Sequence, residues 1–248
     1  MATVTDLTTS VRDQLLDRNR IYEDFFTRES HRLALACREM SDRFLRGGRL
    51  LAFGRGPYAT DAQHVSVEFV HPIIVGKRAL PALDLSILPG PWLEAILHPD
   101  DIVMGFGPPN GDEEIEAALN IAANRGAMTF HFYASDCPSP ARGAWRPAPT
   151  SDHPFLHQEL IEILYHTLWE TVHVFFEHNE LGHDVGDSAF LYPFLGEQKE
   201  PSADVVDQVA ASIRAKAHDD SQLRARVARE QSEQIIAFRV SQHERSFL

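Results

Sequence analysis

The sequence is poor in cysteine and has no long apolar run. Cys37 and Cys137 are its only cysteines among 248 residues. Two thiols so far apart argue against a disulfide framework and fit a reducing compartment. No stretch approaches the roughly 20 apolar residues that cross a bilayer. The first 13 residues also lack the charged-then-apolar pattern of a signal peptide. We therefore expect a cytoplasmic protein with no membrane partner.

Positive charge is scarce as well. Lysine and arginine number 23 against 36 aspartates and glutamates, which gives a formal net charge of -13. Phosphate backbones are bound by basic surfaces, so this balance argues against nucleic acid as the main partner. Hydrophobic residues make up 44% of the chain, which indicates a packed core. The length fits one α/β domain with an extension, or two small domains.

The two ends of the sequence have helical patterns. Residues 4–46 show helical spacing of apolar side chains and stop at a pair of glycines, as one helix or as a hairpin. From residue 202 to about 241 the pattern is helical again but polar, after an apolar patch at 189–195. We expect three segments, which are an N-terminal helical segment at 1–46, a central domain at 47–180 and a C-terminal helical extension at 181–248.

The central segment alternates short apolar runs with amphipathic stretches. Strands are predicted at 49–53, 78–85, 101–106 and 128–133, with a further short strand near Trp145. Helices are predicted after Gly56 as far as Pro72, and at 92–97, 112–123 and 155–177. This alternation predicts an α/β fold, with a parallel sheet covered by helices on both faces. Ligands of such sheets bind at the carboxyl ends of the strands, where the turns at 54–58 and 105–111 should lie.

Two of the predicted helices carry groups that could bind a metal. His64 and Glu68 are four residues apart and share one face of the first helix. Gln158, Glu162 and His166 share one face of the last. Imidazole and carboxylate are ordinary ligands of Zn²⁺. By itself the His64/Glu68 pair fits an exposed ion pair on a helix just as well.

The residues around this pair resemble a known family. The stretch GRGPYATDAQHVSVEF at 54–69 is similar to the sugar-binding turn and first helix of SIS (sugar isomerase) domains. His64-x₃-Glu68 together with Gln158-x₇-His166 resembles the metal-ligand set of phosphoheptose isomerases. The resemblance covers residues 10–178. It implies a three-layer α/β/α SIS domain of the flavodoxin or Rossmann kind, with a five-stranded parallel sheet, in a homo-oligomer that is a tetramer or dimer.

The resemblance also implies a reaction and its residues. Phosphoheptose isomerases interconvert an aldose and a ketose, with sedoheptulose 7-phosphate as substrate and usually Zn²⁺ as cofactor. By this resemblance Glu68 would move a proton between sugar carbons C1 and C2, and His166 would be the partner acid or base. The metal, Zn²⁺ or another divalent ion, would be bound by His64, Glu68, Gln158 and His166. Substrate contacts are expected from Gly54, Arg55, Gly56, Tyr58, Asp84 and Asn110.

The phosphate-binding turns depart from the family pattern. The first turn of the family reads Gly-Asn-Gly-Gly-Ser, and here Tyr58 stands in the serine position. The second loop, Gly105 to Asp112, has no hydroxyl side chain, and Asp112 would place negative charge where phosphate should sit. We therefore expect a metal-dependent aldose–ketose isomerase of a sugar or sugar phosphate, with an altered substrate. The alternative is a non-catalytic SIS protein that binds sugar phosphates as a regulator or assembles with other proteins.

Overall fold

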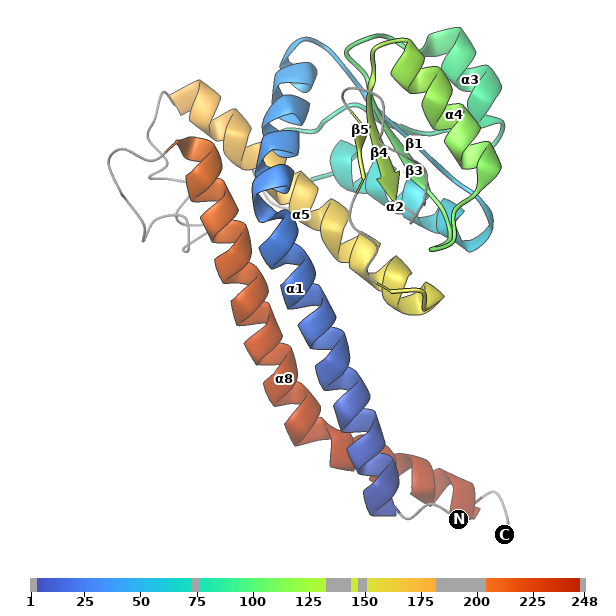
Figure 1. Cartoon of the computed structure of the whole chain (residues 1–248), viewed down its shortest axis with the longest axis vertical. Coiled ribbons are helices and arrows are strands. Elements are labelled where there is room, and N and C mark those ends of the chain that lie inside the picture. Colours follow the sequence, from blue (N-terminus) through green and yellow to red (C-terminus); the bar gives the residue numbers. More distant parts are fainter. Residues whose placement is uncertain (1–3, 73–75, 133–143, 147–150, 182–203, 246–248) are drawn as a thin grey trace. The chain divides into compact units, whose positions relative to one another are not determined.

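The structure is a computed structural model that describes residues 4–72, 76–132, 144–146, 151–181 and 204–245. It divides into two compact units. One comprises residues His31–Ala210, and the other combines Met1–Ser30 with Ala211–Leu248. Two long helices, α1 (Val4–Leu45) and α8 (Val205–Arg245), each cross from one unit to the other (Figure 1).

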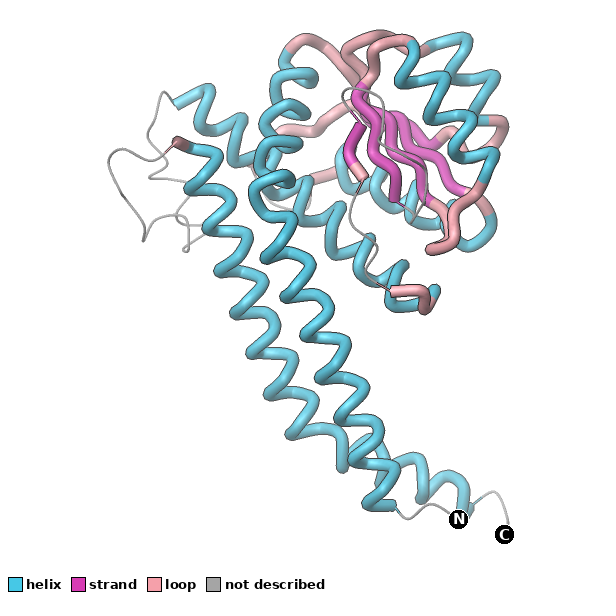
Figure 2. The backbone as a smooth tube through the Cα atoms, viewed as in Figure 1, coloured by secondary structure: helices cyan, strands magenta, loops and turns pink. Residues whose placement is uncertain are grey.

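The larger unit is built on a parallel sheet, drawn in magenta in Figure 2. The strands are β1 (Leu50–Gly54), β2 (Ala82–Asp84), β3 (Ile102–Phe106), β4 (Met128–Phe132) and β5 (Ala144–Trp145). They lie in the order β2-β1-β3-β4-β5, and every neighbouring pair is parallel. The five-stranded parallel sheet expected from the family resemblance is thus confirmed.

Helices cover both faces of this sheet (Figure 1). They are α2 (Ala59–Val70), which follows a short 3-10 turn η1 (Gly56–Tyr58), and α3 (Pro89–Ile96), α4 (Glu113–Asn124) and α5 (Pro154–Leu181). On one face Leu51 and Val103 pack with Leu93 of α3 and Leu119 of α4. The other face is covered by α2 and α5, which contact each other. All residues of β1, β3 and β4 are buried. Because both faces of the sheet are covered, β1 and β3 are continuous apolar runs, whereas β4 also buries Thr129 and His131.

The strand order has a switch point between β1 and β3. From β1 the chain moves outward to β2, and it then returns to the opposite side of β1 to form β3. Leu50 pairs with Ile102 and Gly54 pairs with Phe106, so the two strands end together at their carboxyl edge. In open parallel sheets the crevice at such a point is where ligands bind.

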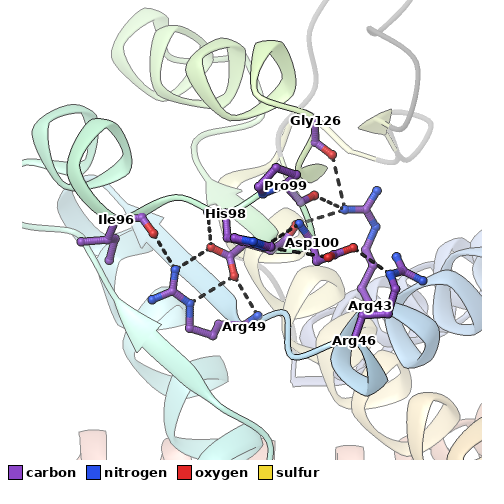
Figure 3. A network of polar contacts seen from close by, with 9 residues as sticks. Arg43, Arg46, Arg49, Ile96, His98, Pro99, Asp100 and Gly126 are labelled. Carbon is purple, nitrogen blue, oxygen red and sulfur yellow. Dashed lines mark hydrogen bonds and ion pairs between the residues drawn. The ribbon is translucent and has the colours of Figure 1, made fainter.

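At the opposite edge a polar network fixes the starts of the same two strands (Figure 3). The carboxylate of Asp101, which is fully buried, accepts from the backbone and guanidinium of Arg49 and from the backbone of His98. Arg43, at the end of α1, donates to the carbonyls of Pro99 and Gly126. These charge-assisted bonds tie β1, β3 and α1 together away from the candidate site.

The predicted elements differ from the structure in a few places. The expected strand at 78–85 forms a ladder only over Ala82–Asp84, since Pro81 has no N–H to donate. The segment at 4–46 is one continuous helix and not a hairpin. Cys137 and the apolar patch at 189–195 lie outside the described residues. The three-segment division of the chain and the homo-oligomer stay predictions.

The smaller unit is helical and combines the first part of α1 with most of α8. Tyr22, Phe25 and Phe26 are buried. Between the two helices, His218 Nδ1 lies 2.8 Å from Glu23 Oε1, and the pKa of His218 is raised by this hydrogen bond. Neither these two helices nor the other described ones have a stretch long and apolar enough to cross a membrane.

Candidate active site

The turn that follows β1 is shaped by two glycines. A Cβ atom on Gly54 would lie 2.3 Å from the carbonyl oxygen of Tyr58, so a side chain cannot be fitted there without moving the backbone. Gly56 has φ of 57°, a left-handed conformation that favours glycine. The sharp turn brings α2 back across the sheet directly from the end of β1. The backbone of the turn therefore explains why glycine occurs at both positions. Their role in substrate binding stays a prediction.

After this turn, α2 runs along the sheet and contacts α5 through its polar face. Glu68 on α2 and His166 on α5 come within 3.5 Å, between Oε1 and Nδ1. The ring centroids of His64 and His166 are 5.1 Å apart. His64 Nδ1 also lies 3.8 Å from Glu162 Oε1. The structure thus brings together three of the four predicted metal ligands, with Glu162 as an additional carboxylate.

Three of these side chains form a group that could hold a cation. Donor atoms of His64, Glu162 and His166 all lie within 4.8 Å of one another. Two imidazoles and one carboxylate are a frequent ligand set of catalytic zinc, which leaves further positions for substrate or water. The donor chemistry of these residues therefore fits the divalent ion that the resemblance implies.

Gln158, the fourth predicted ligand, makes a different contact. Its amide nitrogen donates to Asp61 Oδ2 at 2.9 Å. The pKa of Asp61 is raised to about 6, mainly by burial and in part by the nearby Glu162, while the Gln158 hydrogen bond opposes the shift. The amide oxygen of Gln158 is the atom that could bind a metal. Whether Gln158 is a ligand stays a prediction.

Tyr165 lies behind His64. It is fully buried, and its hydroxyl is 2.9 Å from His64 Nδ1. Burial, together with the carboxylates of Asp61, Glu162 and Glu68, raises the pKa of Tyr165 well above its usual value, so the phenol stays neutral. A hydrogen bond to one ring nitrogen fixes the orientation of an imidazole and leaves the other nitrogen for a ligand.

His157 links α5 to the loop after β3. Its Nε2 lies 3.0 Å from the carbonyl oxygen of Gly107, and its ring packs edge-on against Tyr58 at 6.2 Å. Burial lowers the pKa of His157. Tyr58, a predicted substrate residue, is itself buried.

The remaining predicted contacts lie around the same edge of the sheet. Arg55 is bound by two carboxylates, those of Asp112 at 3.1 Å and Glu114 at 3.2 Å. Asn110 is exposed in the loop before α4. Asp84 accepts from the hydroxyl of Ser86 and also lines a hollow of about 340 Å³ between α2 and β2. That hollow is lined by α2 residues other than His64 and Glu68.

Sequence reasoning left three residues of this cluster without a role. Glu162 was placed on the same helix face as Gln158 and His166, and that spacing was the signal for it. Asp61 on α2 accepts a hydrogen bond from Gln158 on α5. Residue spacing within a single helix cannot predict this contact, because the two residues belong to different helices. Tyr165 follows an apolar helical pattern that indicates packing, and nothing in that pattern predicts its hydrogen bond with His64.

The fold and the cluster together define a class. The larger unit is a three-layer α/β/α domain with strand order 2-1-3-4-5, and His and Glu side chains from α2 and α5 come within 3.5 Å of each other. No family model matches the chain.

Curated relatives give the sequence side of the comparison. The chain is 30% identical over 132 residues to a phosphoheptose isomerase of Desulfovibrio desulfuricans, which is 47% of this chain and 63% of that protein. It is 29% identical over 147 residues to one from Pelobacter propionicus, covering 53% of this chain and 76% of that protein. The chain spans 63% and 59% of the length of the first two relatives.

Solved structures give the fold side. A phosphoheptose isomerase from Francisella tularensis superposes with a TM-score of 0.51 at 18% identity, over 57% of this chain and 84% of that chain. Phosphoheptose isomerase GmhA from Neisseria gonorrhoeae also superposes with a TM-score of 0.51. The identity is 17%, and the match covers 68% of this chain and 98% of that chain. The chain is therefore similar in sequence to curated phosphoheptose isomerases over about half of its length, and its fold resembles that of solved phosphoheptose isomerases.

Proposed function

We propose that this chain is a metal-dependent aldose–ketose isomerase that acts on a sugar or sugar phosphate. The observation that carries the proposal is the cluster of His64, Glu68, Glu162 and His166. The curated relatives named phosphoheptose isomerase support the same reaction class. Enediol chemistry needs a base near a carbon-bound proton and an electrophile on the carbonyl oxygen, and this cluster offers groups for both.

His64, Glu162 and His166 would hold the divalent ion, with Gln158 as a fourth candidate. A bound zinc ion would supply a Lewis acid for the sugar carbonyl oxygen. Glu162 is half exposed, with a side-chain exposure of 49%, so it can turn toward an ion or a substrate. Tyr165 would keep His64 in one orientation through their hydrogen bond.

Glu68 would be the base. Its side chain is only 9% exposed, and it projects from α2 one turn after His64. A carboxylate held in such a partly dry place can take a proton from C2 or C1 and return it to the other carbon. His166, 3.5 Å away, would hold or relay the proton that the enediol oxygens exchange.

The test combines metal content with turnover. We expect protein purified without chelator to carry about one divalent ion per chain, and His64→Ala to lose it. Glu68→Gln should keep the ion and lower kcat by about 10²–10⁴ on whichever sugar is isomerised. His71→Ala, an exposed histidine at the end of α2, is the matched control and should change neither. The proposal is contradicted if wild-type protein contains no divalent metal and if its activity does not increase when a divalent metal is added.

The second candidate is a non-catalytic regulator or assembly protein. It is favoured by the separate helical unit made by α1 and α8. If this candidate is correct, Glu68→Gln keeps the cellular role, and deletion of residues 181–248 abolishes it. The isomerase proposal expects the opposite response to Glu68→Gln.

A further inference from the structure

The turns after β1 and β3 face each other across the switch point. Gly54 and Phe106, in register at the ends of the two strands, lead directly into the turn that carries Arg55 and the loop that carries Asp112. A ligand bound at such a switch point would lie next to these two side chains. An anionic ligand would be held here by helix N-terminal amides and by a basic side chain.

The amides at the start of α4 are already taken. Asp112 Oδ1 accepts from the backbone N–H groups of Glu114 at 3.0 Å and Ile115 at 3.1 Å. This carboxylate is the N-cap of α4 and sits in the position that an external anion would occupy. Its side chain is only 18% exposed.

The basic side chain is also taken. Arg55 Nη1 contacts both oxygens of Asp112, at 3.1 and 3.2 Å, and the carboxylate of Glu114 at 3.2 Å. The first turn of α4 carries Glu113 in addition, whereas the carboxylate of Glu116 pairs with Arg146. A phosphate at this point would have to displace carboxylates from Arg55 and then lie among the remaining ones.

We propose, on top of the isomerase function above, that the part of the substrate bound between these turns is uncharged. The Arg55–Asp112 pair, which spans the switch point, makes the site select a hydroxyl-bearing sugar end over a phosphate. Asp112 is then a specificity-determining residue, because its carboxylate replaces the anion that Arg55 and the α4 amides would otherwise bind. Hydroxyl groups can still accept from Arg55 and donate to Asp112.

The first test uses inorganic phosphate and needs no turnover. Wild type, Asp112→Asn/Glu114→Gln and the same double variant with Arg55→Gln are titrated with phosphate by calorimetry at low ionic strength. Asparagine keeps the N-cap, so the helix start is retained. We expect the double variant to bind phosphate at least tenfold more tightly than wild type, because a freed guanidinium makes charge-assisted bonds. The added Arg55→Gln should abolish the gain.

Glu113→Gln is the matched control, because it removes one charge from the same helical turn without freeing Arg55. An equal gain in this control would mean that general charge reduction is the cause, and it would overturn the assignment to the Arg55–Asp112 pair. The inference is likewise overturned if wild type binds phosphate as tightly as the double variant. None of these outcomes depends on whether the protein isomerises a sugar.

The second test compares a free heptose with its 7-phosphate on wild type. We expect the phosphate to give no tenfold advantage in Kd or in kcat/KM. A sugar phosphate that binds more than tenfold more tightly than the free sugar would overturn the inference and leave the isomerase function standing. If neither sugar is turned over, the isomerase proposal is contradicted, and the phosphate titration still decides the role of Asp112.

Discussion

Glu68 and Glu162 lie on opposite helices of the candidate site and differ in their surroundings. The Glu68 side chain is 9% exposed, and that of Glu162 is 49% exposed. A base that takes a carbon-bound proton benefits from exclusion of water, whereas a carboxylate that binds an ion and admits substrate must be accessible. In the proposed reaction Glu162 would therefore be the metal ligand, and Glu68 would be left as the base.

His131, away from this cluster, allows a prediction about pH and stability. It is buried in β4, with Nε2 3.2 Å from the Thr129 hydroxyl, and it faces Glu116 and Arg146. Burial lowers its pKa to about 4, and the nearby charge of Arg146 contributes, although Glu116 opposes the shift. Between pH 4 and 6.5 the unfolded chain therefore binds more protons than the folded one.

The stability that neutral His131 provides is present above pH 6.5 and is lost as the pH falls toward 4. The expected loss is on the order of 3 kcal/mol in the free energy of unfolding. We expect His131→Gln to lack this component, so that its unfolding free energy falls less steeply with acid than that of wild type. Urea denaturation at several pH values measures the difference. The exposed His153, replaced by Gln, is the control and should leave the wild-type slope, whereas parallel curves for His131→Gln would contradict the prediction.

At the scale of elements, the Asp101 network decides how β1 and β3 start (Figure 3). Asp101 is fully buried, and its carboxylate satisfies the guanidinium and backbone of Arg49. Asp101→Ala would leave that guanidinium, which is about one-third exposed, without its carboxylate partner. We expect a loss of about 3 kcal/mol in the free energy of unfolding, at the lower end of the range for broken buried pairs.

Asp100→Ala is the neighbouring control for this experiment. Asp100 pairs with Arg46 on the surface at 2.8 Å, so the loss should be much smaller. Thermal or urea unfolding of the two variants side by side gives the comparison. Similar losses of unfolding free energy in both variants would contradict the prediction, because they would show that the burial of Asp101 does not increase its contribution to stability.

Most of the elements could be predicted from the sequence because their signals are local. Buried strands such as Ile102–Phe106 are continuous apolar runs, and the glycines at 54 and 56 mark a turn whose backbone requires them. β2 was predicted too long because an apolar run cannot show where a ladder ends. Whether residues 4–46 form one helix or a hairpin could not be decided from the local sequence, because the continuity of a helix depends on what it packs against.

The parts of the candidate site that lie on one helix could be predicted, because residues three or four apart share a helix face. His64 and Glu68, or Gln158 and His166, follow from helical geometry and a family resemblance. The Asp61–Gln158 contact and the Arg55–Asp112 pair join elements far apart in sequence, and they depend on the exact positions of α2, α4 and α5. The opposing charge of Asp112 was visible in the sequence, but its capping of α4 was not.

At the scale of the whole molecule, α1 is one helix with two kinds of surroundings. Its second part, from His31 on, belongs to the sheet-containing unit, where Leu33, Cys37 and Met40 are fully buried. Its first part belongs to the other unit, whose described residues are all helical. A helix is only as stable locally as the tertiary packing of its apolar face.

We therefore expect hydrogen exchange to divide α1 near Ser30. Amides from about residue 33 to 44 should exchange with the slow rates of β3, whereas those of residues 12–29 should exchange at least tenfold faster, because opening the helical unit does not require opening the sheet. Mass spectrometry of peptides from the two parts gives the rates, and α8 supplies an internal check, since its residues after Ala211 should follow the faster group.

A matched pair of substitutions sharpens the same test. Phe25→Ala, in the helical unit, should speed exchange in residues 12–29 and after Ala211 while leaving β3 unchanged, because Phe25 is fully buried in that unit. Met40→Ala, also fully buried but in the other unit, should speed exchange of β3 and of the second part of α1. If either substitution speeds exchange equally in both units, the chain opens as one cooperative body, and the division of α1 has no energetic meaning.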